Sequence, residues 1–204
     1  MTKLLFQGHG SFRIISENNT VIYIDPYAGE GYDIPADIII VTHQHGDHNQ
    51  VQLVAKKDDC VIIQNYDGLI EGKYQSFALK GIKIEAVPAY NKNHDRNQCV
   101  GYIIEVDGIK IYAAGDTSMT TEMPLLKEKN LDFALLPIDG IYNMGPEEAT
   151  ECAKLINAKV SIPIHMKPRT LFDEEMANRF TAPNRLIVKA GEEIDLQEVL
   201  KSRS

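Results

Sequence analysis

Side chains that bind metal ions are concentrated in one short segment, VTHQHGDH, which carries three imidazoles and one carboxylate. In an extended backbone, residues i and i+2 point to the same side, so His43 and His45 can face one ion together. Gly46 allows a sharp turn that would bring Asp47 and His48 back toward the same space. Because a turn does not require three imidazoles and a carboxylate, this segment predicts a metal site.

Three further candidate ligands each come at or shortly after the end of an apolar run that is typical of a buried strand: His94, Asp116 and His165. Taken singly, each would be interpreted as an ordinary hydrogen-bonded surface or turn residue. Ligands gathered at the ends of neighbouring strands, however, form a site on a rigid scaffold, which catalysis requires. The combination therefore extends the predicted metal site.

The full ligand set indicates two ions. Seven ligands exceed what one tetrahedral ion takes, and they suit two ions about 3.5–4 Å apart with a carboxylate between them. Imidazole and carboxylate without a nearby thiolate favour Zn²⁺, Fe or Mn²⁺ over a closed structural zinc site. Open coordination positions would hold a water that is acidified near neutral pH, so the predicted chemistry is hydrolysis.

The elements that must position these residues are mostly short strands, separated by turn residues. Expected strands are Lys3–Gln7, Phe12–Ser16, Val21–Ile24, Ile38–Thr42, Val61–Gln64, Ile82–Ala86, Val100–Val106, Lys110–Ala114, Phe133–Leu136, Ser161–Ile164 and Leu186–Val188. Expected helices are one that begins at Pro146, with Cys152 on its apolar face, and three others at Asp173–Phe180, Thr121–Lys129 and Asp47–Ala55.

Composition indicates an ordinary globular protein. The 204 residues are 44% hydrophobic and 25% charged, which predicts a single domain over 1–204. No secretory signal or membrane-spanning run is evident and the three cysteines are widely spaced, so a cytoplasmic protein with reduced thiols is expected. The net charge of −8 opposes binding to nucleic acid or anionic membranes. A small-molecule substrate is expected, and the oligomeric state stays open.

The HxHxDH stretch formed by residues 43–48 resembles the signature of the metallo-β-lactamase superfamily. From about residue 4 to about residue 168, the chain is similar to small bacterial and archaeal metal-dependent hydrolases related to ascorbate-6-phosphate lactonase. The stretches that carry this likeness are Gly8-His9-Gly10-Ser11-Phe12, Ile24-Asp25-Pro26-Tyr27, Val87-Pro88-Ala89-Tyr90-Asn91, Gly101-Tyr102-Ile103, Ala114-Gly115-Asp116-Thr117, Leu135-Leu136-Pro137-Ile138 and Ile162-Pro163-Ile164-His165.

The resemblance implies an α/β (α+β) fold, namely a four-layer αββα sandwich with the site on one edge between the two sheets. It implies two divalent ions, with Zn²⁺ expected and Mn²⁺ or Fe²⁺ as alternatives, and a metal-bridging hydroxide as the nucleophile. By the family pattern, one ion has His43, His45 and His94, the other has Asp47, His48 and His165, and Asp116 bridges them. Asp47 and Asp116 would be the catalytic carboxylates.

Two positions depart from the family pattern. Relatives commonly carry a histidine where this chain has Ala113, which could alter a contact to a ligand or to the substrate. Some relatives place a histidine directly after Pro-Ala-Tyr, where this chain has Asn91. His94 must then supply the ligand from a longer loop, and it is the only histidine between His48 and His165.

Four further residues, near the predicted ligands in the sequence or by the resemblance, have less evidence for a role in the site. His9 lies in a Gly-His-Gly turn, where a role next to the ligands or the substrate competes with a plain turn. Asp25 could orient a ligating imidazole, although Asp-Pro also begins ordinary turns. Lys167 and Arg169 could bind an anionic substrate group, but solvated loop charges are the expectation. Tyr142 and Asn143 receive no role, and the loops Tyr27–Pro35 and Asn91–Asn97 are candidate lids.

The leading function is hydrolysis of a small ester, lactone or phosphodiester. A nuclease of the same superfamily is the alternative. The negative net charge disfavours it, and the chain length leaves no room for an added RNA-binding domain. A di-iron redox protein is disfavoured because Gln44 occupies a position where such proteins carry a carboxylate. Loss of catalysis with retained metal binding is a further alternative, which Ala113 keeps open.

Overall fold

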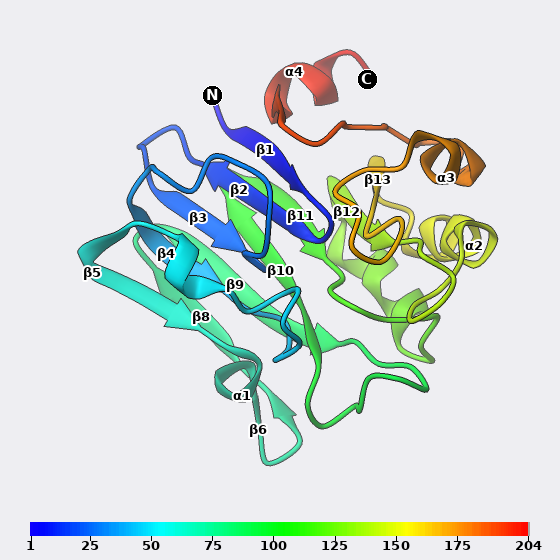
Figure 1. Ribbon diagram of the computed structural model, residues 1–204, viewed down its shortest axis with the longest axis horizontal. Helices are drawn as coiled ribbons and strands as arrows, with labels where there is room; N and C mark the ends of the chain where they lie inside the picture. Colours follow the sequence, from blue (N-terminus) through cyan, green and yellow to red (C-terminus); the bar gives the residue numbers. More distant parts are fainter. Residues whose placement is uncertain (204) are drawn as a thin grey trace.

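The computed structural model describes residues 1–203 and contains two six-stranded mixed sheets that pack face to face (Figure 1). The first sheet has the spatial order β14 (Glu192–Asp195), β1 (Lys3–Gly8), β2 (Ser11–Ile15), β3 (Val21–Ile24), β4 (Ala36–Ile40) and β5 (Lys56–Ile63). The second has the order β13 (Val160–Ile164), β12 (Phe133–Pro137), β11 (Ile109–Ala113), β10 (Val100–Val106), β9 (Ile82–Pro88) and β8 (Ser76–Leu79).

Helices lie on the outer faces and at the ends of the sheets. They are the 3₁₀ helices η1 (Val51–Leu53) and η2 (Met123–Lys129) and the α-helices α1 (Asn65–Gly68), α2 (Pro146–Ile156), α3 (Glu174–Arg179) and α4 (Leu196–Lys201). A small hairpin of β6 (Leu69–Ile70) and β7 (Lys73–Tyr74) follows α1. The expected αββα sandwich is therefore present, and no helix within residues 1–203 is long and apolar enough to span a membrane.

The main core lies between the two sheets, because alternate residues of each strand point inward. In β12, Leu135 joins the core between the sheets, whereas Ala134 and Leu136 pack outward against α2, η2 and α3. Cys152 of α2 is buried in this outer layer, as its position on the apolar face predicts. The outer face of the first sheet is covered more thinly, by η1 and the loop that contains Tyr32 and Ile34.

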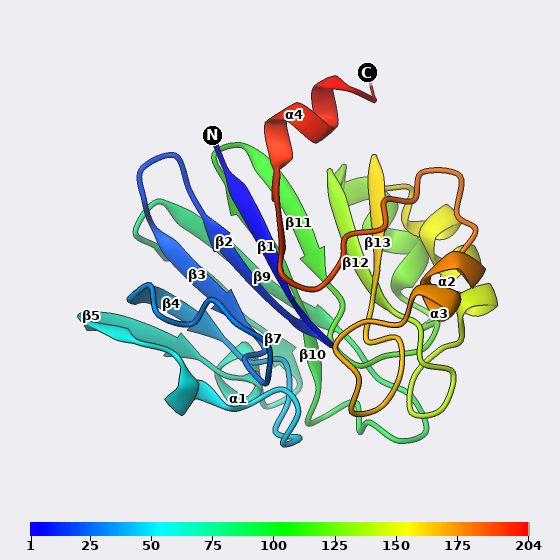
Figure 2. The ribbon, with the colours of Figure 1, turned by 45° about the horizontal axis from the view of Figure 1, so that its top comes forward.

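Strand directions gather the loops of the site at one edge. Strands β11, β12 and β13 are parallel to one another, and β9 runs in the same direction because β10 is antiparallel to both β9 and β11. The carboxyl ends of β9, β11 and β13 therefore meet at one edge of the second sheet. Figure 2 shows the loops gathered at this edge of the sandwich, on the side opposite α4.

Three expected elements are absent or of another type, and the structure adds α1, β6, β7, β8, β14 and α4, which the sequence did not predict. Asp47–Ala55 is not an α-helix, because the Gln50 N–H donates to the Pro26 carbonyl outside the segment and only η1 forms. The Thr121–Lys129 segment forms a 3₁₀ helix. Leu186–Val188 is not a strand, since the backbone beside β13 makes only the isolated bridge between Arg185 and Ser161. Conversely, the acidic strand β14 pairs with β1 although nothing in its composition predicts a strand.

Candidate metal centre

The HxHxDH segment leaves the end of β4 and turns back on itself. His43 is buried while His45 is exposed, and Nε2 of His43 lies 3.1 Å from Nδ1 of His45. The His48 N–H donates to the His45 carbonyl at 3.0 Å, which closes the turn through Gly46 and Asp47. The segment thus folds as its sequence predicts, with the four side chains on the inner side of one tight loop.

One group of candidate ligands consists of His43, His45, His94 and Asp116, whose donor atoms all lie within 4.8 Å of one another. His94 reaches this group from the loop after β9. Its backbone pairs with Asn91 in an isolated bridge, and its Nδ1 lies 3.0 Å from Oδ1 of Asn91. Asn91 therefore holds His94 in place within this donor group.

A second group consists of His9, Asp47, His48 and His165, again within 4.8 Å of one another. Nε2 of His9 lies 3.0 Å from Oδ2 of Asp47, and the His9 ring centroid lies 3.8 Å from that of His165. The sequence left His9 open between a role beside the ligands or the substrate and a plain turn, and the structure places it within the second donor group. All seven predicted ligands thus lie in one of two adjacent groups.

Asp116 lies between the two groups and presents one oxygen to each. Its Oδ2 lies 3.2 Å from Nε2 of His94, and its Oδ1 lies 3.2 Å from Nε2 of His48 and 3.5 Å from Nε2 of His165. The carboxylate is buried, with 3% of the residue exposed. This is the arrangement that a carboxylate between two cations requires.

Asp25 supports the second group from behind. Its Oδ2 lies 2.8 Å from Nδ1 of His48 and accepts a hydrogen bond from the Thr42 hydroxyl, while its Oδ1 accepts from the Thr42 backbone N–H. The Thr42 hydroxyl in turn lies 3.1 Å from Nδ1 of His43. The prediction that Asp25 could orient an imidazole thus has a direct structural counterpart.

Asp139 contacts His165 in the way that Asp25 contacts His48, and the sequence analysis did not predict this role. Its Oδ2 lies 3.0 Å from Nδ1 of His165, and its Oδ1 accepts hydrogen bonds from the backbone N–H groups of Ile141 and Tyr142. The signal was available, because Asp139 follows the apolar run of β12 in the same way that His165 follows β13.

Burial and neighbouring charges strongly shift the pKa values of the side chains in the centre. Burial lowers the pKa of His43 to about 2. Burial would also lower the pKa of His165, but Asp116, Asp139 and Asp47 outweigh it and raise that pKa to about 9. The pKa of Asp116 is held well below its usual value because neighbouring imidazoles, His48 first, outweigh the effect of its burial.

The donor atoms fit a metal ion. Among the described residues, Nε2 of His48, Nε2 of His165 and Oδ1 of Asp116 are buried and have no hydrogen-bond partner. Buried polar atoms without partners are costly, and a divalent cation would satisfy all three at once. The donors are imidazole and carboxylate, the set that Zn²⁺, Mn²⁺ and Fe²⁺ accept.

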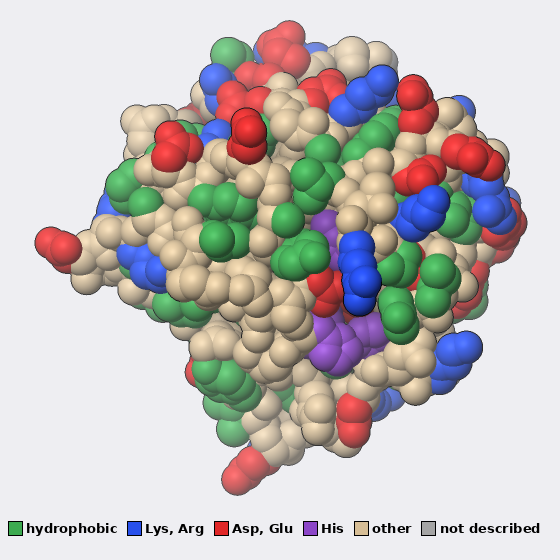
Figure 3. All heavy atoms as spheres, viewed as in Figure 1, with side chains coloured by type: hydrophobic (Ala, Val, Ile, Leu, Met, Phe, Trp, Pro, Cys, Tyr) green, Lys and Arg blue, Asp and Glu red, His purple; other side chains and the backbone are tan. Residues whose placement is uncertain are grey.

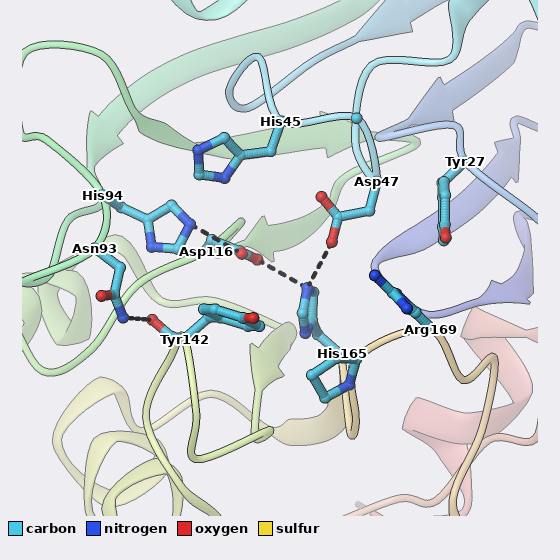
Figure 4. A pocket seen from close by; sticks show the side chains of 11 residues that line it. Tyr27, His45, Asp47, Asn93, His94, Asp116, Tyr142, His165 and Arg169 are labelled. Carbon is cyan, nitrogen blue, oxygen red and sulfur yellow. Dashed lines mark hydrogen bonds and ion pairs between the residues drawn. The ribbon is translucent and has the colours of Figure 1, made fainter.

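A cavity of about 520 Å³ opens over both groups (Figure 4). In the space-filling view a patch of histidine surface lies at its mouth, next to acidic and basic side chains (Figure 3). The cavity is lined by Tyr27, His45, Gly46, Asp47, Asn93, His94, Asp116, Tyr142, His165, Pro168 and Arg169.

Of the other residues considered in the sequence, some line the cavity and some lie outside it. Tyr142 and Arg169 line the cavity, whereas Lys167 pairs with Asp173 at 3.4 Å outside it. Ala113 does not line the cavity, since its side chain is buried in the core between the sheets. Each of the two candidate lid loops contributes to the wall, through Tyr27 and through Asn93 and His94.

Comparisons with known proteins agree with this architecture. The sequence pattern of the β-lactamase superfamily domain matches residues 3–165. The UPF0173 metal-dependent hydrolase of Thermococcus onnurineus is 34% identical over 96% of this chain and 100% of its own length.

Solved structures show the same fold. A protein of Parabacteroides distasonis, assigned as a metal-dependent hydrolase, superposes with a TM-score of 0.76 at 31% identity and covers 94% of both chains. A Thermotoga maritima protein, assigned as a zinc-dependent hydrolase of the metallo-β-lactamase superfamily, has a TM-score of 0.60 at 30% identity, over 83% of this chain and 78% of its own. The chain therefore belongs to the metallo-β-lactamase superfamily and, within it, to the UPF0173 family of metal-dependent hydrolases.

Proposed function

We propose that this protein is a binuclear metal-dependent hydrolase that cleaves a small ester, lactone or phosphodiester. The observation that carries the proposal is Asp116, whose two oxygens face two separate groups of imidazoles. A single ion in either group would leave one of these oxygens without a cation. Zinc is the proposed metal, and the Thermotoga maritima relative, assigned as zinc-dependent, supports that choice.

Each group of side chains has its own task. His43, His45 and His94 would hold one ion, Asp47, His48 and His165 the other, and Asp116 both. When bound, the two ions would supply an acidified water and stabilise negative charge on the oxygen of the attacked group.

Asp47 is suited to a second role, in positioning the nucleophile. Its side chain is 36% exposed toward the cavity, and its Oδ2 is fixed by His9 at 3.0 Å. The pKa of this carboxyl is lowered because His165 and His9 outweigh the effect of partial burial, so it is ionised near neutral pH. An ionised carboxylate at the cavity wall can accept a hydrogen bond from the attacking water and so orient it.

The proposed substrate is a small molecule. A cavity of about 520 Å³ is within the usual range for small ligands, and the net charge of −8 disfavours nucleic acid. The likeness of residues 4–168 to hydrolases related to ascorbate-6-phosphate lactonase supports a lactone as the first candidate.

Metal content and hydrolysis test the proposal together. Protein purified without chelator should carry about two ions per chain by mass spectrometry, and Asp116→Asn should carry fewer. Asp132→Asn is the matched control, since Asp132 is a buried carboxylate that binds the Lys110 N–H and Lys159 away from the cavity. Lactones, esters and phosphodiesters should be hydrolysed by the wild type and by Asp132→Asn, and not by Asp116→Asn. One ion or none, unchanged in Asp116→Asn and not restored by added Zn²⁺, Mn²⁺ or Fe²⁺, would overturn the binuclear proposal.

A further inference from the structure

Arg169 is the only lysine or arginine that lines the cavity of the metal centre. Within residues 1–203, its guanidinium makes no hydrogen bond or ion pair. Its neighbour Lys167 differs, because it pairs with Asp173 on the outer side of the same loop. An unpaired guanidinium next to a substrate cavity offers a fork of donors for a planar or tetrahedral oxyanion.

The backbone at Arg169 is in the left-handed region, with a φ of 58°. Three other non-glycine residues with positive φ belong to the metal centre or support it: His9 at 57°, Asp25 at 46° and His165 at 46°. Such conformations cost free energy for residues with a Cβ and are concentrated at functional sites. Of the ten described non-glycine residues with positive φ, four are thus Arg169 and these three residues, and the other six lie in turns and helix ends away from the centre.

The loop that carries Arg169 is tied to the centre at both ends. The His165 N–H donates to the His9 carbonyl at 2.7 Å, and the His9 N–H donates to the Leu171 carbonyl at 2.7 Å. Nδ1 of His9 also lies 3.3 Å from the Thr170 carbonyl. The position of Arg169 is therefore coupled to His9 and His165, both members of the second donor group.

Figure 4 shows Arg169 beside Tyr27, on the side of the cavity formed by Asp47 and His165. Asn93, His94 and Tyr142 form the opposite side. The one guanidinium of the described lining thus lies at one end of the cavity, and a molecule that reaches both the metal centre and Arg169 would need an acceptor group at each of two positions.

We propose that Arg169 binds an anionic group of the substrate, a carboxylate or a phosphate, beside Tyr27 and next to the second donor group. This inference rests on the proposed function and adds the class of substrate: an ester, lactone or phosphodiester with a further oxyanion. The charged group anchors the molecule at Arg169 and leaves the bond to be cleaved over Asp116.

Equilibrium binding of inert probes tests this site without turnover. The probes are succinate, glutarate and adipate, each compared with its monoamide, so that the two members of a pair differ in one negative charge. A further comparison, 3-phosphonopropionate against succinate, separates a phosphate-like group from a carboxylate. Binding to Zn²⁺-loaded protein is measured by titration calorimetry. The wild type should prefer the diacid of at least one pair by about tenfold or more, which is typical for a charge-assisted contact.

Arg169→Met should remove that preference to within about twofold, with metal content unchanged. Met and Arg carry the same backbone strain at positive φ, so the variant isolates the guanidinium. Lys167→Met is the matched control and should keep the wild-type preference. A wild type without any preference, or an Arg169→Met variant that retains it, would overturn the proposal. The two proposals can fail separately. If the wild type showed no hydrolysis or only one ion but still preferred the diacids, the proposed function would be overturned and the anion site would stand.

Discussion

Asp25 places Oδ2 2.8 Å from Nδ1 of His48, and both side chains are buried. An ionised carboxylate only accepts hydrogen bonds, so His48 donates from Nδ1 and its Nε2 is directed at Oδ1 of Asp116, 3.2 Å away. The remaining oxygen of Asp25 accepts from the Thr42 N–H at 2.7 Å. Asp25 therefore fixes the orientation of the His48 ring, and it would favour the tautomer with its proton on Nδ1 once Nε2 gives up its proton to a metal ion.

Substitution of Asp25 should weaken metal binding without removing a ligand. In Asp25→Asn the amide can donate to Nδ1 and favour the wrong tautomer of His48, so we expect metal affinity to fall roughly 10- to 100-fold. Competition against a chromogenic chelator measures it. Asp37→Asn is the control, since Asp37 is a buried carboxylate that binds the Val21 N–H and Lys57 away from the cavity. That variant should lose stability and keep its metal affinity. Equal affinities in Asp25→Asn and the wild type would refute the orienting role.

Asp139 should support one half of the centre only. Asp139→Asn keeps an oxygen for the N–H groups of Ile141 and Tyr142 but removes the charge beside His165, so the loop should stay folded while the second donor group weakens. We expect a two-step metal titration in which one step shifts by roughly 10- to 100-fold and the other does not. A uniform shift of both steps, or none, would contradict the assignment of Asp139 to His165.

Local patterns in the sequence predicted most strands and the metal-binding loop, because alternation of buried residues and the spacing of His43, His45 and His48 are properties of short segments. The acidic strand β14 could not be predicted this way. Its residues have low strand propensity, and Arg13 and Lys3 of neighbouring strands stabilise it through Glu193.

Contacts between distant segments explain the other differences. The contact of Asn91 with Nδ1 of His94, which positions that imidazole in the first donor group, is not evident from the sequence of the loop. The helix expected over Asp47–Ala55 does not form, because the Gln50 N–H donates to the Pro26 carbonyl instead of to a carbonyl within the segment. The hydrophobic periodicity of the segment gives no sign of this contact. His9 joins the second donor group through a turn that is remote in sequence from Asp47 and His165.

Gly115 permits the close approach of the two sheets at the centre. Its φ is +62°, and a Cβ would come within 2.8 Å of the Thr42 Cβ. Gly108→Ala is the matched control, because Gly108 has a φ of +78° and an added Cβ would meet no described atom within 4 Å. We expect Gly108→Ala to lower the free energy of unfolding by about 1–2 kcal/mol and Gly115→Ala by at least about 1 kcal/mol more, from denaturant titration. Only Gly115→Ala should also lower metal affinity, since it displaces Asp116. Equal losses in the two variants would refute the close approach.

The metal-free protein should lose stability as pH rises from 7 to 9. The folded pKa of His165 is about 9, above its usual 6.5, so its stabilisation is full below pH 6.5 and is lost as the pH approaches 9. In this window His43 is neutral and Asp116 is ionised in both states, so neither contributes a slope, whereas the raised pKa of His48 acts in the same direction as that of His165. Urea unfolding of chelator-treated protein should show a fall of roughly 1–3 kcal/mol. His165→Asn should show a smaller fall, and a stability that rises with pH would refute the raised pKa.

Metal affinity should have the opposite dependence on pH, because an imidazole must lose its proton before it binds a cation. The raised pKa values of His165 and His48 mean that both protons are displaced near pH 7.5, so affinity should rise by up to roughly 100-fold per pH unit. Above about pH 9 His165 no longer contributes. Calorimetry in buffers of different ionisation enthalpy should detect about two protons released at pH 7.5.

Two variants that each lack one predicted ligand distinguish the number of protons released on metal binding from the metal affinity. His43→Asn removes a ligand whose pKa is about 2, so affinity should fall while the number of released protons stays the same. His165→Asn should lower both, with about one proton fewer released. Both substitutions delete one imidazole, so loss of a ligand alone cannot produce the difference between them. If the two variants released equal numbers of protons, the carboxylates around His165 would not hold its proton in the metal-free protein.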